Sequence, residues 1–144
     1  MDSFFKQYVF ITVPGVSWFI AQFLKFVFVM LKYKKLDFRR LVGSGGMPSG
    51  HSAFMVSLAT VTTKHFGFAS FEFGLTAAVS IIVMYDATGV RRAAGKQAQV
   101  LNKIIFSQEH NINVEEKLKE LIGHTPVEVL VGALLGVFLG YFLS

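Results

Sequence analysis

Four apolar stretches follow one another along the chain, and polar or charged segments separate them. They cover approximately residues 8–31, 52–68, 73–90 and 126–143. A helix that crosses the hydrocarbon core of a bilayer needs about 20 apolar residues, within a range of about 17–25. The pattern therefore predicts four transmembrane helices, of which the second is the shortest. We expect an all-α integral membrane bundle that forms one domain over residues 1–144.

The segment after the third stretch has a different periodicity. From Arg91 onward, basic and amide side chains fall on one face of a predicted helix and apolar side chains fall on another. Such a pattern is typical of an amphipathic helix that lies at a membrane surface. Asn113 can cap a second short helix with Glu116 as its capping-box partner, and Gly123 would end it. Residues 91–123 are thus expected to form an interfacial helical loop.

Composition supports the membrane location. Hydrophobic residues make up 53% of the chain and charged residues 16%, whereas about a quarter of the residues in a soluble domain are charged. The net charge of +5 comes from basic residues beside the apolar stretches, which fits membrane topology better than nucleic-acid binding. The chain contains no cysteine, which excludes disulfides and thiolate metal sites.

The basic residues also predict an orientation. Eleven of them lie in the first and third loops, residues 32–50 and 91–125, and four crossings place these two loops on one side. By the positive-inside rule we expect both loops, and the active face, in the cytoplasm, with both termini on the opposite side.

Two ionisable residues within the predicted spans need a specific environment. Lys25 must either extend its amine to the membrane surface or face protein. A charged Asp86 within a membrane helix costs free energy unless it has a partner. Either an ion pair with a nearby arginine or a direct role in the candidate site would explain its presence.

Three polar motifs stand at helix ends on the basic side. They are Gly-Gly-Met-Pro-Ser-Gly-His at 45–51, Tyr-Asp-Ala-Thr-Gly-Val-Arg-Arg at 85–92 and Gly-His-Thr-Pro-Val-Glu at 123–128. The predicted topology brings His51 and His124 to the same face as Arg91 and Arg92. The two arginines could equally be topology anchors or headgroup ligands.

These residue types suit phosphoryl transfer. Arginine forks, the N–H groups of a glycine-rich turn and a helix N-terminus neutralise phosphate, and the turn also offers the Ser49 hydroxyl. One imidazole can attack phosphorus while a second protonates the leaving alkoxide. Glu128 follows His124 by four residues, so on a helix its carboxylate can reach and orient the ring.

The same residues resemble a known superfamily. The Pro-Ser-Gly-His turn ending at His51, and the later His-x-Pro-x-Glu-Val beginning at His124, are similar to the second and third motifs of the type 2 phosphatidic acid phosphatases, which share their site with vanadium haloperoxidases. The stretch from Tyr85 to Asn102 resembles the hallmark of that superfamily's divergent small membrane branch. The likeness covers roughly residues 43–136.

The resemblance implies a lipid phosphate phosphatase that needs no metal or other cofactor. His124 would be the nucleophile that forms a phosphohistidine, Glu128 its orienting carboxylate and His51 the general acid. Ser49 and Gly50 would bind phosphate oxygens.

The chain departs from the superfamily pattern at several positions. Glu128 stands where an aspartate is usual, and Leu118 stands six positions before His124, where an arginine is usual. A basic residue from elsewhere must therefore bind the phosphate. The candidates are Arg91, Arg92 and Lys96. Of the usual first motif, a lysine followed by Arg-Pro, the potential remnants are Lys32, Lys35, Arg39 and Arg40.

The sequence leaves the substrate and one alternative function open. An isoprenyl phosphate or diphosphate fits the apolar setting, and so does a glycerolipid phosphate; membrane lipids are the expected surroundings. The alternative is a non-catalytic membrane protein that binds or transports anionic or phosphorylated lipids. Vanadate-dependent halide oxidation is disfavoured because the chain has no large soluble domain.

A stripe of small residues marks the last apolar stretch. Gly132, Gly136 and Gly140 recur at four-residue spacing, which lets two membrane helices approach closely. The stripe predicts either a homo-oligomer contact or packing within the chain.

Overall fold

The computed structural model describes residues 7–33, 46–106, 118, 120 and 122–144. These residues form the helices α2 (Val9–Tyr33), α3 (Gly50–Phe66), α4 (Phe71–Thr88), α5 (Val90–Ile105) and α6 (Pro126–Leu143). No strand occurs in the described part of the chain. The predicted all-α membrane bundle is confirmed.

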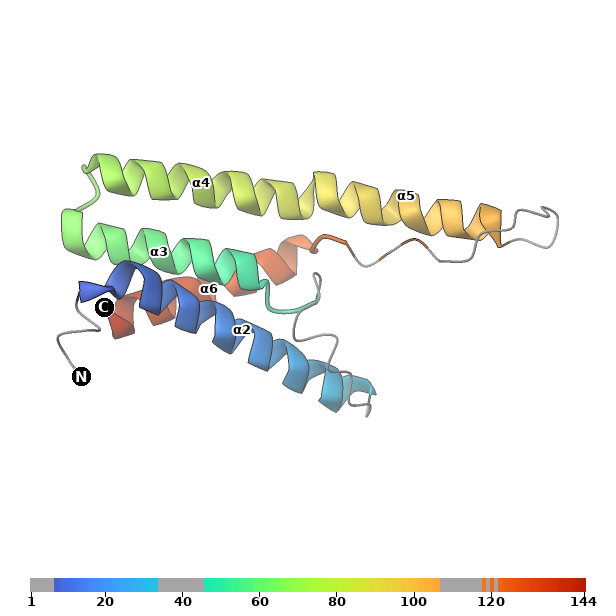
Figure 1. Ribbon diagram of the computed structural model, residues 1–144, viewed down its shortest axis with the longest axis horizontal. Coiled ribbons are helices and arrows are strands. Elements are labelled where there is room, and N and C mark those ends of the chain that lie inside the picture. The colour runs from blue at the N-terminus through green and yellow to red at the C-terminus, as the bar shows by residue number, and fades with distance from the viewer. Residues whose placement is uncertain (1–6, 34–45, 107–117, 119, 121) are drawn as a thin grey trace.

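Three stretches of helix are long and apolar enough to cross a membrane. They are Val9–Leu31, Phe71–Ile105 and Pro126–Leu143. The direction of the chain alternates from α2 to α3, α4 and α6 (Figure 1). α3 has 17 residues and carries several hydroxyl groups, so length and composition alone do not identify it as a span. Its crossing of the bilayer stays a prediction.

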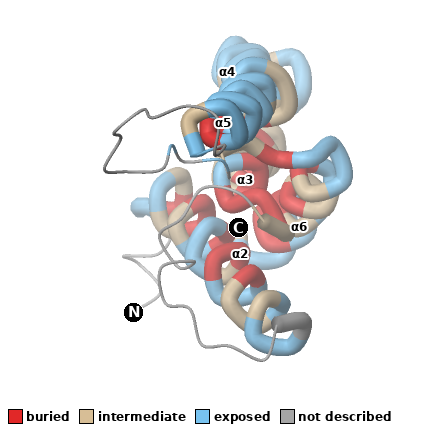
Figure 2. The backbone as a smooth tube through the Cα atoms, turned by 90° about the vertical axis from the view of Figure 1, so that its right-hand side faces the viewer, coloured by how far each residue is buried: buried red, intermediate tan, exposed pale blue. Residues whose placement is uncertain are grey.

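α3 lies at the centre of the bundle, with α2, α4 and α6 around it (Figure 2). Thr60, Thr62 and Thr63 each donate a hydrogen bond of 2.8 Å to the carbonyl oxygen four residues earlier. On α4, Ser80 donates to the carbonyl oxygen of Met55 in α3 at 3.0 Å. Because these hydroxyls have partners, burying a polar helix among apolar ones leaves few unpaired groups in the core.

The glycine stripe of α6 lies directly against α3 and the Ser49 residue that caps it. A Cβ atom on Gly132 would lie 2.4 Å from the carbonyl oxygen of Ser49, and one on Gly136 would lie 2.7 Å from that of Ala53. All three glycines of the stripe are buried. The stripe therefore serves packing within the chain, and it gives no support to self-association.

The amphipathic helix predicted after the third span is present as α5. It continues the line of α4 away from the bundle (Figure 1), and it buries Gly95, Ala98 and Asn102 while several large apolar side chains remain exposed. Its location in the membrane interface stays a prediction. The second short helix proposed at Asn113 falls outside the described residues, except for its expected end at Gly123.

The close contact between α6 and α3 makes a prediction about stability. Gly136→Ala should lower the free energy of unfolding by about 1–3 kcal/mol, because the added methyl group overpacks a backbone contact. Gly74→Ala in α4 is the matched control, since a Cβ there meets nothing within 4 Å. Unfolding of the purified proteins in mixed micelles measures both, and equal stability of the two variants would contradict the packing described here.

Candidate active site

Two backbone hydrogen bonds bring the three polar motifs together at one end of the bundle. The N–H of Ser49 donates to the carbonyl oxygen of Glu128 at 3.0 Å, which joins the first motif to the third. The N–H of His124 donates to the carbonyl oxygen of Ala87 at 2.9 Å, which joins the third motif to the second. Residues that are far apart in sequence thus meet through main-chain contacts.

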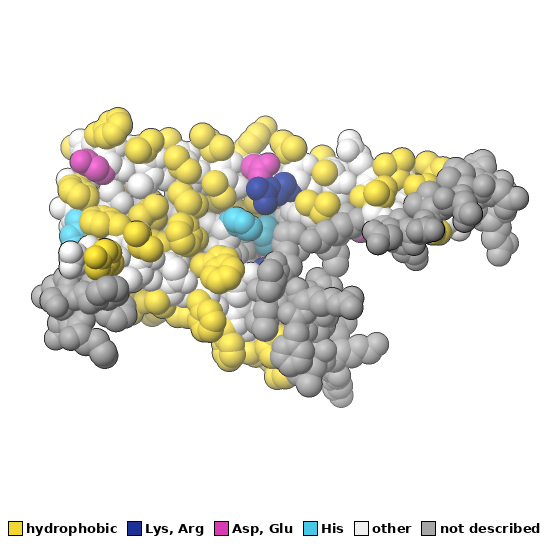
Figure 3. Space-filling model, in the orientation of Figure 1, with side chains coloured by type: hydrophobic (Ala, Val, Ile, Leu, Met, Phe, Trp, Pro, Cys, Tyr) yellow, Lys and Arg dark blue, Asp and Glu magenta, His cyan; other side chains and the backbone are white. Residues whose placement is uncertain are grey.

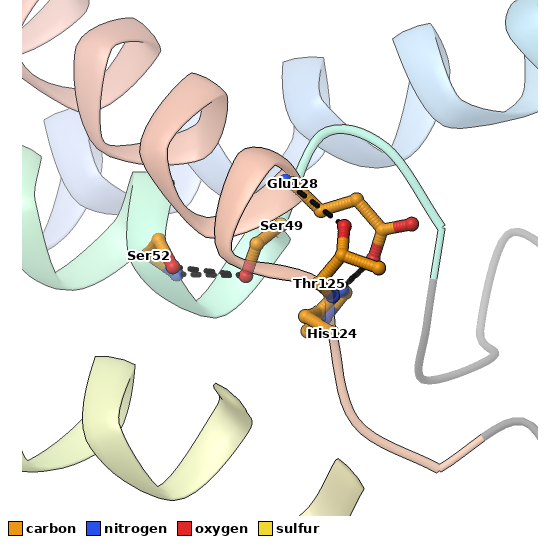
Figure 4. Close-up of polar contacts among 5 residues, drawn as sticks. All are labelled: Ser49, Ser52, His124, Thr125 and Glu128. Atoms are coloured by element: carbon orange, nitrogen blue, oxygen red, sulfur yellow. Dashed lines mark hydrogen bonds and ion pairs between the residues drawn. The ribbon is translucent and has the colours of Figure 1, made fainter. Parts of the chain in front are cut away.

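The Glu128 carboxylate contacts both the N-cap residue of α6 and the ring of His124. Thr125 caps α6, and Glu128 completes the capping box by accepting from the N–H of Thr125 at 3.1 Å. The same oxygen, Oε2, lies 3.1 Å from Nδ1 of His124 (Figure 4). The start of α6 and the orientation of the His124 ring therefore depend on one oxygen atom.

This contact determines which nitrogen of His124 is nucleophilic. An ionised carboxylate only accepts hydrogen bonds. Nδ1 of the neutral ring therefore carries the proton and donates a hydrogen bond to Glu128. Nε2 is then the unprotonated nitrogen that can attack an electrophile. His124 is buried, with 4% of its surface exposed.

The environment of His124 favours its neutral form. Burial lowers the pKa of its imidazole below the usual 6.5, because a low-dielectric surrounding disfavours the cation. The positive charge of Lys25 also lowers this pKa, while the Glu128 carboxylate and the backbone of Gly46 oppose the shift. The net direction is downward, so the ring stays neutral to lower pH.

A small pocket brings His51 and His124 together with Arg91. Val83, Ala87 and Gly123 complete its lining. Its volume is ≈ 10 Å³, close to the minimum for one water molecule, so a phosphate group enters only when the pocket widens. Figure 3 shows histidine, basic and acidic side chains gathered at one place on a face that is otherwise mostly apolar.

Arg91 has a carboxylate partner. Its Nε atom lies 2.5 Å from Oδ2 of Asp86, and both side chains are partly exposed. Of the two explanations for Asp86 within a span, the structure displays the ion pair. Asp86 holds the guanidinium group at the mouth of the pocket.

Arg92 and Lys96 line a different cavity from Arg91. This second groove has a volume of ≈ 230 Å³, and it lies between α5, the start of α6 and the turn at Gly46. Glu120 and Glu128 also line it, and His124 belongs to both cavities. The three basic candidates for phosphate binding are therefore divided between two cavities, and Gly123 and His124 line both of them.

Ser49 and Gly50 have structural partners. The Ser49 hydroxyl is fully buried, caps α3 and lies 2.9 Å from that of Ser52. Figure 4 shows the two serine side chains facing each other. A Cβ on Gly50 would lie 3.2 Å from the ring of Trp18. Neither residue lines the pocket around His51, so their contact with phosphate stays a prediction.

Sequence reasoning did not assign Lys25 to the site. It is only 2% exposed, and its charge acts on both His51 and His124. Its stem lies against the turn of the first motif, since a Cβ on Gly46 would be 3.4 Å from its Cγ. A lysine inside an apolar run is a signal for such a role, because burying its charge is costly.

Of the proposed remnants of the first motif, Lys32 lies in the last turn of α2, whereas Lys35, Arg39 and Arg40 lie outside the described residues. In the described part of the chain, no cluster of three or more histidine and carboxylate side chains is arranged to hold a metal ion.

Comparisons with known proteins identify relatives of this chain. The family described as "Divergent PAP2 family" matches residues 6–139. The "Uncharacterized membrane protein YuiD" of Bacillus subtilis (strain 168) is 38% identical over 136 residues, which cover 86% of each chain. No solved structure matches the chain significantly.

The buried contact between His124 and Glu128 makes a prediction about ionisation. The pKa of His124 should lie below 6.5, and Glu128→Gln should lower it further, because the variant removes a negative charge that favours the imidazolium. Glutamine preserves the capping box, so the fold should survive. Titration of ring-labelled histidine by NMR measures both values, and a His124 pKa above 6.5 in the unaltered protein would contradict the burial effect.

Proposed function

The chain belongs to the divergent PAP2 family, and on that premise we propose that it is a metal-independent lipid phosphate phosphatase. The reaction would proceed through a phosphohistidine on His124. The observation that carries the proposal is the shared pocket, in which a neutral, carboxylate-oriented imidazole stands with a second histidine and an arginine.

The first chemical step transfers the phosphoryl group to the protein. Nε2 of His124 attacks phosphorus, a P–N bond forms, and the P–O bond to the lipid breaks. His51, protonated at that moment, gives its proton to the departing lipid oxygen and becomes neutral. The products of this step are the lipid alcohol and phosphohistidine.

The second step regenerates the protein. A water molecule attacks phosphorus, and neutral His51 removes a proton from it. The P–N bond breaks, its electron pair returns to Nε2, and inorganic phosphate leaves. Glu128 keeps its hydrogen bond to Nδ1 in both steps and stabilises the positive charge that develops on the ring.

Arg91 and Lys25 are the cations that suit the transferred phosphoryl group. Arg91 lines the pocket, and its fork can bind two phosphate oxygens. It would take the place of the arginine expected at position 118. Lys25 adds a buried positive charge from α2, which acts strongly because the surroundings are of low dielectric.

The surroundings of the pocket support a lipid substrate. Large apolar side chains on α4 are exposed, among them Ile82 and Tyr85, which lie within two residues of the pocket residue Val83 in the sequence. A lipid tail would remain among them while the phosphate enters the pocket. Isoprenyl and glycerolipid phosphates both fit this arrangement, and by the positive-inside rule the pocket would open to the cytoplasm.

The proposal predicts phosphate release that depends on His124. The purified protein in mixed micelles, with a chelator present, should release phosphate from a member of a panel of isoprenyl phosphates, isoprenyl diphosphates, phosphatidate and phosphatidylglycerophosphate. His124→Ala should lower kcat at least about 1,000-fold, because it removes the nucleophile. Vanadate should inhibit the reaction because it mimics pentacoordinate phosphorus.

His65→Ala is the matched control for that experiment. His65 is exposed, and its ring packs against Phe10 on another part of the bundle, so its loss should leave kcat unchanged. Full activity of His124→Ala would overturn the mechanism. Absence of turnover with every lipid, together with phospholipid binding that survives His124→Asn, would establish the binding alternative.

The division of the cations between two cavities predicts unequal roles for neighbouring arginines. Arg91→Ala should lower kcat/KM about 100-fold, because it removes a charged donor from the developing phosphoryl charge. Arg92→Ala should lower it less than about tenfold, since that side chain lines the second groove. Steady-state kinetics on the best lipid substrate compares the two variants. A larger loss from Arg92→Ala would place the phosphate in the second groove.

A further inference from the structure

The residues before His124 lie in backbone contact with α5. We call Leu118, Glu120, Ile122 and Gly123 the strap; it runs beside α5 toward His124 (Figure 1). A Cβ on Gly95 of α5 would lie 2.5 Å from the Glu120 carbonyl oxygen and 2.7 Å from that of Ile122. Glycine at position 95 therefore allows the strap to touch the helix backbone.

Gly123 makes the corresponding contact at the other end of the strap. Its φ angle is +95°, and a Cβ there would lie 2.5 Å from the backbone nitrogen of Arg92. The left-handed conformation turns the chain toward the start of α6. His124 follows at once, with its N–H bonded to the carbonyl oxygen of Ala87.

The side chain of Asn102 binds the strap through hydrogen bonds at Leu118 and Glu120, the strap residues farthest from His124. Its Nδ2 donates to the Leu118 carbonyl oxygen at 2.8 Å and to Oε1 of Glu120 at 2.8 Å. Its Oδ1 accepts from the N–H of Leu118 at 2.9 Å. The side-chain amide thus pairs with both polar groups of one strap residue, as a neighbouring peptide would.

The chemistry of this contact is specific to an amide. Asn102 is 5% exposed, so each of its polar groups needs a partner. An aspartate at this position would keep the acceptor for the Leu118 N–H but lose both donors, and it would face the Glu120 carboxylate. A leucine would leave the strap groups without any of the three bonds.

The strap connects two parts of the candidate site. Its end leads into His124, and the helix beneath it carries Arg91 in its first turn, which lines the same pocket. A shift of the strap along α5 would move the imidazole relative to the guanidinium group. The register between strap and helix therefore sets the geometry of the pocket.

We propose that Asn102 is a positioning residue that fixes this register and thereby places His124 opposite Arg91. Asn102 does so without touching the pocket itself. The structural part of this inference stands on the strap contacts, and its kinetic consequence rests on the proposed function.

Distance measurement tests the structural part. The chain has no native cysteine, so spin labels can be placed at Gln97→Cys in α5 and Val127→Cys in α6, both of which are exposed. Pulsed EPR on the full chain in lipid nanodiscs should give one narrow distance distribution. Asn102→Leu should broaden or shift it, whereas Lys103→Leu, an exposed neighbour on α5, should not.

A paired substitution gives a milder and more specific version of the test. Asn102→Asp should also broaden the distribution, and it keeps a polar side chain in case the leucine variant does not fold. Combining it with Glu120→Gln should narrow the distribution again, because the new amide can donate to the new carboxylate. A role in general stability alone would not produce this recovery.

The kinetic arm uses the same variants without labels. Asn102→Leu should lower kcat about 100-fold, because a misplacement of about 1 Å in a catalytic group costs this much, while KM should change less than about threefold. Unchanged distances in the Asn102 variants would overturn the inference, and so would altered distances with unchanged kcat. If the unaltered protein shows no turnover, the proposed function fails, and the distances alone decide the role of Asn102.

Discussion

The close approach of α6 to α3 is the constraint on which the site depends. Gly132 lies so near the Ser49 carbonyl oxygen that a Cβ would sit 2.4 Å away, and the N–H of Ser49 bonds to the carbonyl oxygen of Glu128. Helices with larger residues at this crossing would stand farther apart. His51 lies in the first turn of α3, and His124 directly precedes the N-cap of α6. The contact between the starts of the two helices therefore sets the distance between the two imidazoles.

Most of the fold could be predicted because its signals are local. The stretch predicted at 126–143 coincides with α6, where Thr125, proline and Glu128 give a complete capping box before an apolar run. The stretch predicted at 52–68 begins and ends two residues late compared with α3, since the Ser49 cap marks the start better than hydropathy does. The role of the glycine stripe needed the structure, because spacing alone does not say which helix it contacts.

The site could be predicted from residues that are close in sequence and from the topology that brings His51, Arg91 and His124 to one end of the bundle. His124 and Glu128 are one helical turn apart, and periodicity alone brings them within reach. The sequence does not distinguish Arg91 from Arg92, but successive helix residues point about 100° apart, and the two arginines line different cavities, both bordered by Gly123 of the strap. The burial of Lys25 depends on how α2 packs against the turn at Gly46, a contact between distant residues that no local pattern encodes.

Leu118 stands where the superfamily has an arginine, and Arg91 is the residue that we propose as its substitute. In the superfamily pattern, the arginine side chain at the position of Leu118 would reach the phosphate from the strap itself. Here the backbone of Leu118 is held by Asn102, so this residue contributes an anchor to α5 in place of a charge. In the proposed mechanism the cation comes instead from the first turn of this helix, where Arg91 pairs with Asp86 and lines the pocket. A positive charge on a second element can replace one on the strap only if the two elements keep a fixed register, which is the role that we propose for the Asn102 contacts.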